Sequence, residues 1–196
     1  MKCKRCLDIF ISLLVILTLF WWLFPMLALM VYLSSKGPVF FKQKRTGLFG
    51  EEFNCYKFRT MVVNTEADVK QATITDERIT RLGHFLRETN LDELPQFFNV
   101  LKGQMSIVGP RPHMVFHTRE FSQIVEGYHM RLQVKPGITG LAQIKGYRGA
   151  TPDYRSIYKR IQWDNFYVEN HSVLLDLQII GMTVLHFVKQ LYRTDD

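Results

Sequence analysis

The sequence predicts an α+β fold, mostly helical, that lies on one membrane face as a monotopic protein. Residues 9–33 form an apolar run without a charged side chain, and residues 39–44 and 53–59 resemble the strands of a small β-hairpin. Most remaining apolar residues recur at helical spacing. We divide the 196 residues into a re-entrant membrane hairpin, 1–36, and one continuous unit on the cytosolic face, 37–196.

The apolar run is long enough to span a ~30 Å hydrocarbon core as a helix. Pro25 lies within it and costs about 3 kcal/mol in a straight helix. Both flanks are basic, and lysine and arginine favour the cytoplasmic side of a membrane. These features predict a re-entrant helix–break–helix with its break near Phe24 and Pro25. A kinked single span remains open because membrane helices tolerate proline.

The hairpin strands are joined by a turn-prone segment, 46–51, that contains Gly47 and Gly50. Residues 76–88 predict a helix that buries its apolar side chains, Ile79, Leu82, Phe85 and Leu86. The segment 172–192 is apolar, but charged residues interrupt it. Charge at bilayer depth is costly, so we expect an interfacial or core-packing helix there.

Adjacent carboxylates, Asp92 and Glu93, precede the apolar helical pattern of residues 94–101. Pro95 fits only the first helical turn, which places both carboxylates at or beside the N-cap. Helix N-terminal N–H groups attract anions and keep a carboxylate ionised. The pair therefore suits metal-dependent phosphoryl transfer, although an ordinary acidic helix cap would have the same pattern.

Several basic side chains are candidates for binding phosphate. Lys57 and Arg59 share one face of the second strand, and Arg87 lies on the following helix. Arg111 stands between two prolines, which suits a bidentate contact with phosphate. Taken singly, each of these residues also fits a solvated surface charge.

Composition narrows the function classes. The net charge is +7 and the pI is about 9.4, which favours anionic lipid headgroups as partners. No nucleic-acid motif is present, so nucleic acid is not an expected partner. The three cysteines are expected to be free thiols, and the six histidines show no metal-ligand spacing.

Six ordered stretches carry a resemblance to a known family. They are residues 35–41, 56–61, 91–96, 99–103, 105–112 and 135–143. In this order they resemble the monotopic phosphoglycosyl transferases, a family of bacterial sugar transferases. The segment 146–149 is most similar to the branch that initiates exopolysaccharide and capsule repeat units.

The resemblance implies transfer of a sugar-1-phosphate from a UDP-sugar to undecaprenyl phosphate, with release of UMP. Asp92 matches the family's nucleophile, which forms an aspartyl-phosphosugar intermediate, and Glu93 matches the partner that engages Mg²⁺. The site's arginines and the helix N-terminus are expected to keep the pKa of Asp92 low. Further matched positions are the substrate-binding candidates Lys57, Arg59, Arg87, Arg111, Arg148 and Asp164.

The resemblance also implies the cytosolic face of the bacterial cytoplasmic (inner) membrane, and it leaves a homodimer open. Only eight residues precede the apolar run, so the sequence fits a small stand-alone member or the catalytic part of a larger one. Two rival interpretations remain. One is a membrane enzyme or phosphatase with a true span, and the other is a non-catalytic adaptor of polysaccharide assembly.

Overall fold

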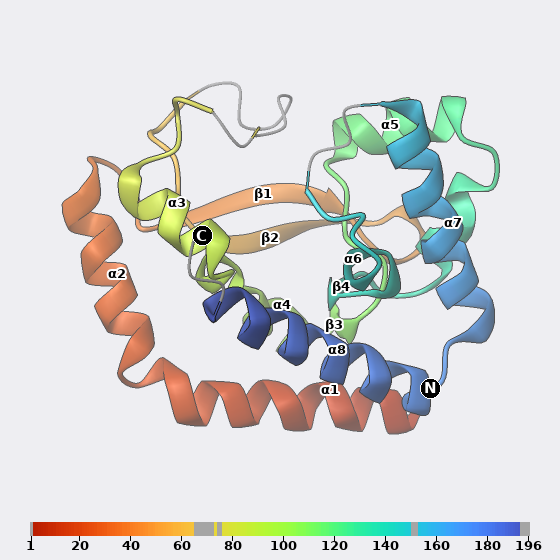
Figure 1. The fold of residues 1–196 in the computed structure, drawn as a ribbon, viewed down its shortest axis with the longest axis horizontal. Helices are drawn as coiled ribbons and strands as arrows, with labels where there is room; N and C mark the ends of the chain where they lie inside the picture. Colours follow the sequence, from red (N-terminus) through yellow and green to blue (C-terminus); the bar gives the residue numbers. More distant parts are fainter. Residues whose placement is uncertain (1, 65–72, 74–75, 150–152, 193–196) are drawn as a thin grey trace.

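An N-terminal helical arm runs along one edge of the molecule (Figure 1). The computed structural model describes residues 2–64, 73, 76–149 and 153–192. The arm comprises α1 (Lys2–Val15), the π-helical turn η1 (Ile16–Phe20) and α2 (Leu23–Ser34). Its two halves are bent by 64°. The fold is mostly helical with a small two-stranded hairpin, as predicted.

The bend lies at Trp21 and Trp22, just before the expected position at Phe24 and Pro25. A proline ring clashes with the carbonyl four residues earlier, and Trp21 holds that position relative to Pro25. Pro25 itself lies in the first turn of α2, where its missing N–H costs least. The predicted helix break is confirmed, and the proline explains its position.

The predicted hairpin is also confirmed. Strands β1 (Phe40–Thr46) and β2 (Glu52–Phe58) pair antiparallel, joined by the 3-10 turn η2 (Leu48–Gly50). A second pair, β3 (Ser106–Val108) and β4 (Gly137–Thr139), is parallel and was not predicted. A Cβ atom at Gly109 would lie 2.3 Å from the Lys135 carbonyl oxygen, so this close approach requires glycine.

The helix expected over residues 76–88 is shorter. Helix α3 (Arg81–Glu88) begins at Thr80, whose side-chain oxygen accepts a hydrogen bond from the Gly83 N–H at 2.9 Å. Ile79 is buried as expected, but it lies before the helix and pairs with Met61 in an isolated β-bridge. Leu86 is also buried as expected, whereas Phe85 is 49% exposed. The predicted start of the helix was wrong because the N-cap Thr80 begins the helix after the bridge, and the predicted burial of Phe85 was also wrong.

The remaining described elements follow in chain order. They are η3 (Leu91–Glu93), α4 (Gln96–Leu101), α5 (Val115–Ile124), η4 (Tyr128–Gln133), α6 (Leu141–Ile144), α7 (Tyr154–Asn170) and α8 (Val173–Leu191). Three apolar clusters join them. One centres on Val100, Met105 and Tyr167, a second lies between α5 and α7, and the third packs α2 against β2 and α3.

Helix α1 is fastened to the interior by its few charged residues. Lys4 Nζ lies 2.6 Å from Asp176 Oδ2 of α8, and Tyr167 donates to the other oxygen of Asp176 at 2.6 Å. Asp8 Oδ1 accepts hydrogen bonds from the Ser106 hydroxyl and the Ile107 N–H, both at 2.9 Å. Lys4 and Asp8 therefore face α8 and β3, and Arg5 donates to the carbonyls of Val100 and Leu101 in α4.

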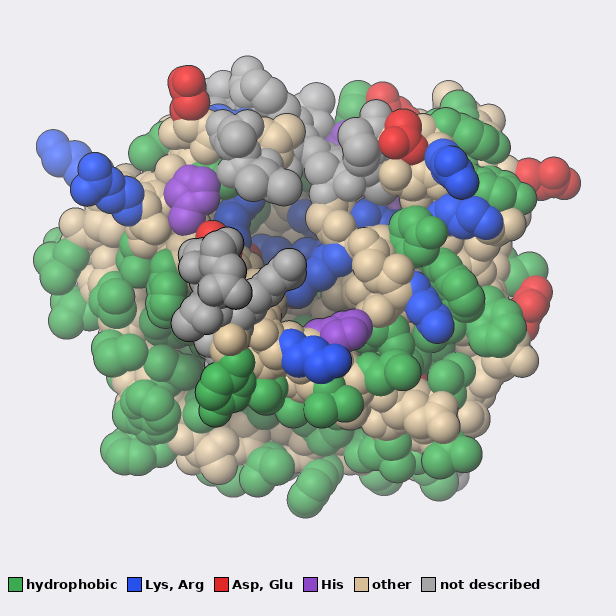
Figure 2. Space-filling view, viewed as in Figure 1, with side chains coloured by type: hydrophobic (Ala, Val, Ile, Leu, Met, Phe, Trp, Pro, Cys, Tyr) green, Lys and Arg blue, Asp and Glu red, His purple; other side chains and the backbone are tan. Residues whose placement is uncertain are grey.

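The outer faces of α1, α2 and α8 are apolar and exposed. Leu17 and Leu33 are each 73% exposed, and Leu174 is 68% exposed. Hydrophobic side chains gather along the lower and left margins of Figure 2, where these helices lie in Figure 1. Residues 173–190 of α8 are long and apolar enough to cross a membrane, and the bent arm passes the same test as a pair.

Candidate active site

The two predicted carboxylates lie on the single 3-10 turn η3, directly before α4. Asn90 adopts a left-handed conformation with φ of 57°, and its carbonyl accepts the Glu93 N–H at 3.1 Å. Asp92 and Glu93 are each only 6% exposed. The sequence prediction placed this turn correctly beside a helix start.

The first N–H groups of α4 are not the source of positive charge that the sequence predicted. The N–H groups of Phe97 and Phe98 bond to the carbonyls of Leu94 and Pro95 at 3.1 Å, and α4 is only six residues long. Side-chain cations around the turn supply the positive charge instead.

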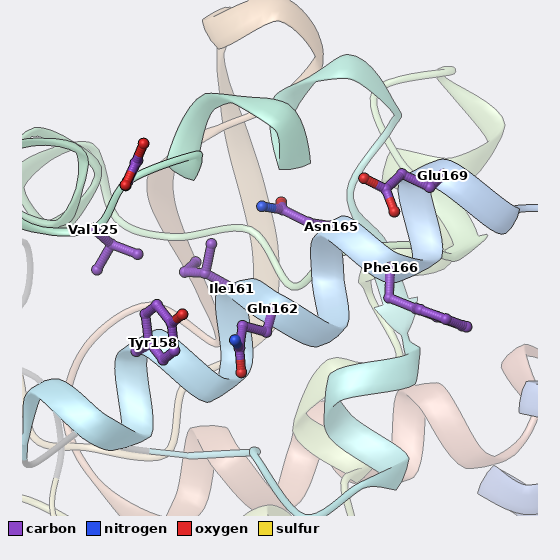
Figure 3. A pocket seen from close by; sticks show the side chains of 8 residues that line it. Val125, Tyr158, Ile161, Gln162, Asn165, Phe166 and Glu169 are labelled. Carbon is purple, nitrogen blue, oxygen red and sulfur yellow. The ribbon is translucent and has the colours of Figure 1, made fainter.

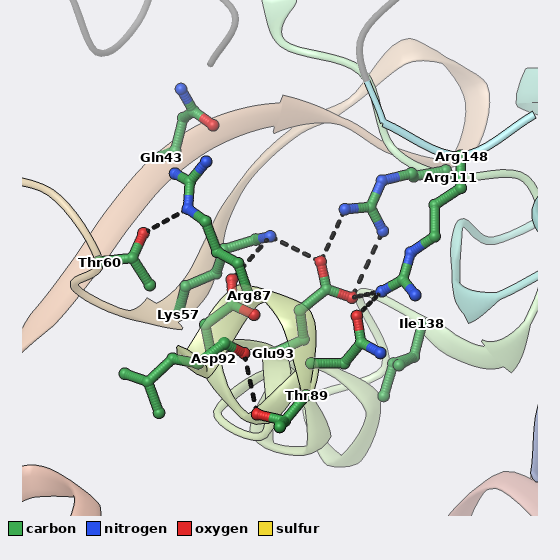
Figure 4. A network of polar contacts seen from close by, with 12 residues as sticks. Gln43, Lys57, Thr60, Arg87, Thr89, Asp92, Glu93, Arg111, Ile138 and Arg148 are labelled. Carbon is green, nitrogen blue, oxygen red and sulfur yellow. Dashed lines mark hydrogen bonds and ion pairs between the residues drawn. The ribbon is translucent and has the colours of Figure 1, made fainter. Parts of the chain in front are cut away.

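Glu93 is the centre of a polar network (Figure 4). Its Oε1 lies 2.6 Å from both Lys57 Nζ and Arg111 Nη2. Its Oε2 lies 3.4 Å from Arg111 Nη1 and 3.7 Å from Arg148 Nη2, and the Arg148 guanidinium also donates to Asn90 Oδ1. Asp92 Oδ2 has a looser contact, 3.5 Å from Lys57 Nζ.

The two neighbouring carboxyl groups titrate in opposite directions. Burial acts to raise the pKa of Glu93, but Arg111 and Lys57 outweigh it and hold that pKa well below its usual value. For Asp92, burial outweighs Lys57 and raises the pKa. The expectation of a low pKa at Asp92 was therefore wrong, because the closest cations pair with Glu93.

Arg87 joins the same cluster from α3. Its Nε donates to the Thr60 hydroxyl at 2.8 Å, and Figure 4 shows its side chain beside Lys57 and Asp92. Burial lowers the pKa of Arg87, and Asp92 partly offsets this shift. Four cations thus surround two carboxylates, which leaves a positive excess for binding phosphate.

Arg59 is not brought to the carboxylates. Its Nη2 donates to the Ser35 carbonyl at 2.5 Å, and its Nη1 donates to the Lys36 carbonyl at 3.1 Å. Although it lies two residues beyond Lys57, it follows the end of β2. Arg59 therefore holds the backbone that follows α2 and lies away from the cluster.

Asp164 does not contact the carboxylates, and it is linked to the cluster through Arg131. It pairs with Arg131 at 2.9 Å, and both side chains are 2% exposed. Arg131 in turn donates to the Arg111 carbonyl at 2.5 Å. Sequence reasoning missed Arg131, because neither its spacing nor its neighbours distinguish it from a surface cation.

Arg160 was missed for the same reason. It is buried on α7 and donates to the carbonyls of Tyr147 and Gly149, at 3.0 and 2.8 Å. Burial, reinforced by Arg111, lowers the pKa of Arg160 to about 10, so it stays charged at neutral pH.

The carboxylate pair fits Mg²⁺. This ion takes oxygen ligands and uses only one or two carboxylates where phosphate and water complete its shell. In the described part of the chain, no group of three or more His, Cys, Asp or Glu side chains could hold a metal by itself. Asp92 and Glu93 are adjacent in the chain and could supply these one or two carboxylates.

Two cavities lie outside the cluster. One, of about 580 Å³, is lined mostly by apolar side chains that include Phe24, Phe40, Pro95 and Phe98. The other, of about 380 Å³, lies along α7 and is lined by Tyr158 and Asn165 among others (Figure 3). No predicted site residue lines either cavity.

Two buried carboxylates thus lie among four cations, and helices α1, α2 and α8 expose apolar outer faces, which we call the apolar helical frame. A family model described as bacterial sugar transferase matches residues 1–190. The chain belongs to this bacterial sugar transferase family, which confirms the resemblance of its motifs.

Named relatives agree with this family. A UDP-glucose:undecaprenyl-phosphate glucose-1-phosphate transferase of Klebsiella pneumoniae is 51% identical over 92% of this chain. The chain spans only 39% of that relative's length. The exopolysaccharide production protein PSS of Rhizobium leguminosarum bv. phaseoli is 44% identical over 93% of each chain. A UDP-N-acetylgalactosamine-undecaprenyl-phosphate N-acetylgalactosaminephosphotransferase of Aeromonas hydrophila is 41% identical over 92% of this chain and 42% of its own length.

Proposed function

We propose that this protein transfers a sugar-1-phosphate from a UDP-sugar to undecaprenyl phosphate and releases UMP, as the first membrane step of exopolysaccharide, capsule or other glycoconjugate assembly. The observation that carries the proposal is the buried pair Asp92 and Glu93 among four cations. The names of the family relatives support the same reaction class.

The reaction proceeds in two displacements at one phosphorus atom. An oxygen of ionised Asp92 attacks the β-phosphorus, and the bond from that phosphorus to the bridging oxygen breaks, so UMP leaves with the bridging oxygen. The phosphate oxygen of undecaprenyl phosphate then attacks the same phosphorus and releases the Asp92 carboxylate. The product is an undecaprenyl diphosphate sugar.

The hydrogen bonding favours Asp92 over Glu93 as the nucleophile. Both oxygens of Glu93 face guanidinium or ammonium groups, at distances from 2.6 Å. The cation contact of Asp92 is longer, at 3.5 Å. A carboxylate oxygen that is less tightly hydrogen-bonded, on a group of raised pKa, is the better nucleophile.

Positive charge is required because a carboxylate must approach a diphosphate of the same sign. Lys57, Arg87, Arg111 and Arg148 supply four fixed cations that can bind the phosphate oxygens. Asp92 and Glu93 would hold Mg²⁺, which supplies further positive charge to the diphosphate when bound.

We further propose that the bent arm enters the membrane and returns to the cytosolic face. Three observations support this topology: the 64° bend, the exposed apolar outer faces, and the basic residues on both flanks. Helix α8 would then lie along the interface, since Asp176 pairs inward with Lys4.

The larger cavity offers a place for the isoprenoid chain of the carrier. Its lining residues Phe24 and Phe98 form an edge-to-face pair with ring centroids 5.9 Å apart. Pro95, also in the lining, follows the carboxylate turn directly. An apolar chain in this cavity would therefore end close to Asp92.

The test is UMP release from a panel of UDP-sugars with Mg²⁺, with and without undecaprenyl phosphate, followed by intact mass. Carrier-dependent UMP from one sugar, with an added phosphosugar mass absent in Asp92→Asn, is the expected result. No UMP from any sugar, in folded and lipid-embedded protein, would contradict the proposal and favour the adaptor.

A further inference from the structure

Two buried arginines hold the backbone beside two cations of the site without contacting the carboxylates themselves. Arg131 Nη2 donates to the carbonyl of Arg111 at 2.5 Å. Arg160 donates to the carbonyls of Tyr147 and Gly149, the two neighbours of Arg148. Each buried guanidinium therefore holds the chain at one cation of the site.

Arg160 and Asp164, the partner of Arg131, lie on one face of α7. Arg160 and Asp164 are four residues apart on this helix, so their side chains lie one above the other. Asp164 pairs with Arg131 at 2.9 Å and also raises the pKa of Arg160 electrostatically. One carboxylate thus compensates two buried cations, which would otherwise be too costly to bury.

The segment that carries Arg148 depends on this support. Helix α6 ends at Ile144, and both Gly146 and Gly149 have positive φ values, of 89° and 90°. The N–H groups of residues 145–147 still bond to carbonyls of α6, but within the described part of the chain no backbone–backbone hydrogen bond holds Arg148 or Gly149. Arg160 supplies two hydrogen bonds to the carbonyls on either side of Arg148. The Arg148 guanidinium then reaches Glu93 at 3.7 Å.

We propose that Arg131 and Arg160 are positioning residues that set the spacing of Arg111 and Arg148 for the diphosphate of the nucleotide sugar. Arg131 acts through Arg111, and Arg160 acts through Arg148. Asp164 serves both arginines, which gives this residue a role different from a direct contact with metal or nucleotide. This inference rests on the proposed function for the identity of the ligand.

A double-mutant cycle separates positioning from general stability. Arg160→Lys keeps the charge and loses the planar fork, so we expect the Kd for the UDP-sugar to rise about tenfold, or 1.4 kcal/mol. In an Arg148→Ala background the same change should have no further effect, whereas in an Arg111→Ala background its full effect should remain. Arg131→Lys should show the reverse pattern.

Arg155→Lys is the matched control, because Arg155 is exposed on the same helix. It should leave the Kd unchanged. Additive effects of Arg160→Lys in both backgrounds would overturn the proposal, since they indicate a change to the whole fold. If Arg160→Lys does not fold, Arg160→Gln, which retains an amide donor, takes its place in the cycle.

Amide hydrogen exchange tests the same inference without a ligand. Arg160→Lys should accelerate exchange in a peptide covering residues 145–149, and Arg131→Lys should not. Unchanged exchange in Arg160→Lys would overturn the positioning role even if the protein transfers sugar phosphate as proposed. Wild-type protein that binds no UDP-sugar, but shows the exchange difference, would instead contradict the proposed function alone.

Discussion

The carboxylate cluster buries charged side chains, whereas the apolar helical frame exposes hydrophobic ones. In the cluster, Asp92 and Glu93 are nearly buried, whereas leucines of α1, α2 and α8 are largely exposed. Water-soluble proteins normally show the reverse distribution. Under the proposed function, a phosphate ligand is the partner of the cluster and lipid is the partner of the frame.

The two regions are also joined by polar contacts. Lys4 of α1 pairs with Asp176, and Arg59 holds the carbonyls that follow α2. The apolar frame is therefore fixed in position relative to the turn that carries Asp92. The proposed reaction, between a soluble nucleotide sugar and a membrane carrier, would use such a fixed relation.

The largest expected effect is on the cluster side of this comparison. Asp92→Asn should abolish both UMP release and sugar-phosphate transfer, because an amide cannot form the acyl phosphate. The measurement is single-turnover UMP release together with intact mass. Substantial residual turnover would contradict the assignment of the nucleophile.

The Tm of Asp92→Asn is the control that separates loss of the nucleophile from unfolding. The raised pKa of Asp92 means that its ionisation disfavours the folded state, and this cost appears as pH rises through the unfolded value toward the folded one. Asp92→Asn should therefore not lower the Tm at pH 7. A large drop in Tm would mean that the loss of activity reflects unfolding.

Glu93→Gln should have the next largest effect, about 100-fold on kcat/KM. It removes the negative charge that Lys57 and Arg111 share and replaces one acceptor oxygen with a donor amide, so it weakens the pair that would hold Mg²⁺. The lowered pKa of Glu93 stabilises the fold above the unfolded value, and this contribution is lost as pH falls. The variant should therefore also lower the Tm at pH 7, unlike Asp92→Asn.

The measurement is a Mg²⁺ titration of rate with a melting curve for each variant. A titration identical to that of the wild type would remove Glu93 from the metal site. Equal Tm values for the two variants at pH 7 would contradict the opposite pKa shifts of the pair.

Pro25→Ala tests the frame side of the comparison. Alanine restores the missing N–H and removes the clash near Trp21, so the arm should straighten toward a single span. Cysteine accessibility at residue 2 would then shift to the outer side in a fraction of molecules. Unchanged cytoplasmic accessibility at this residue would show that the proline does not decide the bend.

Local structure was more predictable from sequence than the long-range contacts that support the cluster. The proline break, the hairpin and the carboxylate turn depend on local preferences, which short stretches of sequence contain. Arg131 and Arg160 could not be found in this way, because their importance lies in contacts with residues far along the chain. The parallel pair β3 and β4 was missed because three-residue strands carry no periodicity.

The pKa of Asp92 shows a second limit. Sequence reasoning counted the nearby cations, but it could not tell which carboxylate they contact. In the structure Lys57 and Arg111 approach Glu93 at 2.6 Å, so Glu93 receives most of their effect. Charge counting therefore predicted the four cations beside the carboxylates, but it wrongly added Arg59 and gave the wrong direction for the pKa of Asp92.

A shift in the pH profile follows from that ionisation. Asp92 must be ionised to attack, so the acidic limb of kcat/KM should lie above the ordinary aspartate value of about 3.9. Lys57→Met removes a charge that lowers the pKa of Asp92, and the limb should move to higher pH. A limb at the ordinary aspartate value in both proteins would contradict the raised pKa.

The smallest expected effect falls where the two regions meet, at the apolar cavity. Phe98→Ser should raise the KM for undecaprenyl phosphate about three- to tenfold, because it removes an aromatic wall for the isoprenoid chain. The KM for the UDP-sugar should stay constant, since Phe98 has no contact with the four cations that would bind phosphate. The measurement is steady-state kinetics with each substrate varied in turn.

Phe116→Ser is the matched control for this variant. Phe116 is 42% exposed, close to the 38% of Phe98, but it lies on α5 and does not line the cavity. Equal effects of the two substitutions on carrier KM would mean that surface hydrophobicity, and not the cavity, governs carrier binding. A change confined to Phe98→Ser would place the carrier chain against α4. The cavity would then be where the carrier, held by the apolar frame, meets the charged cluster.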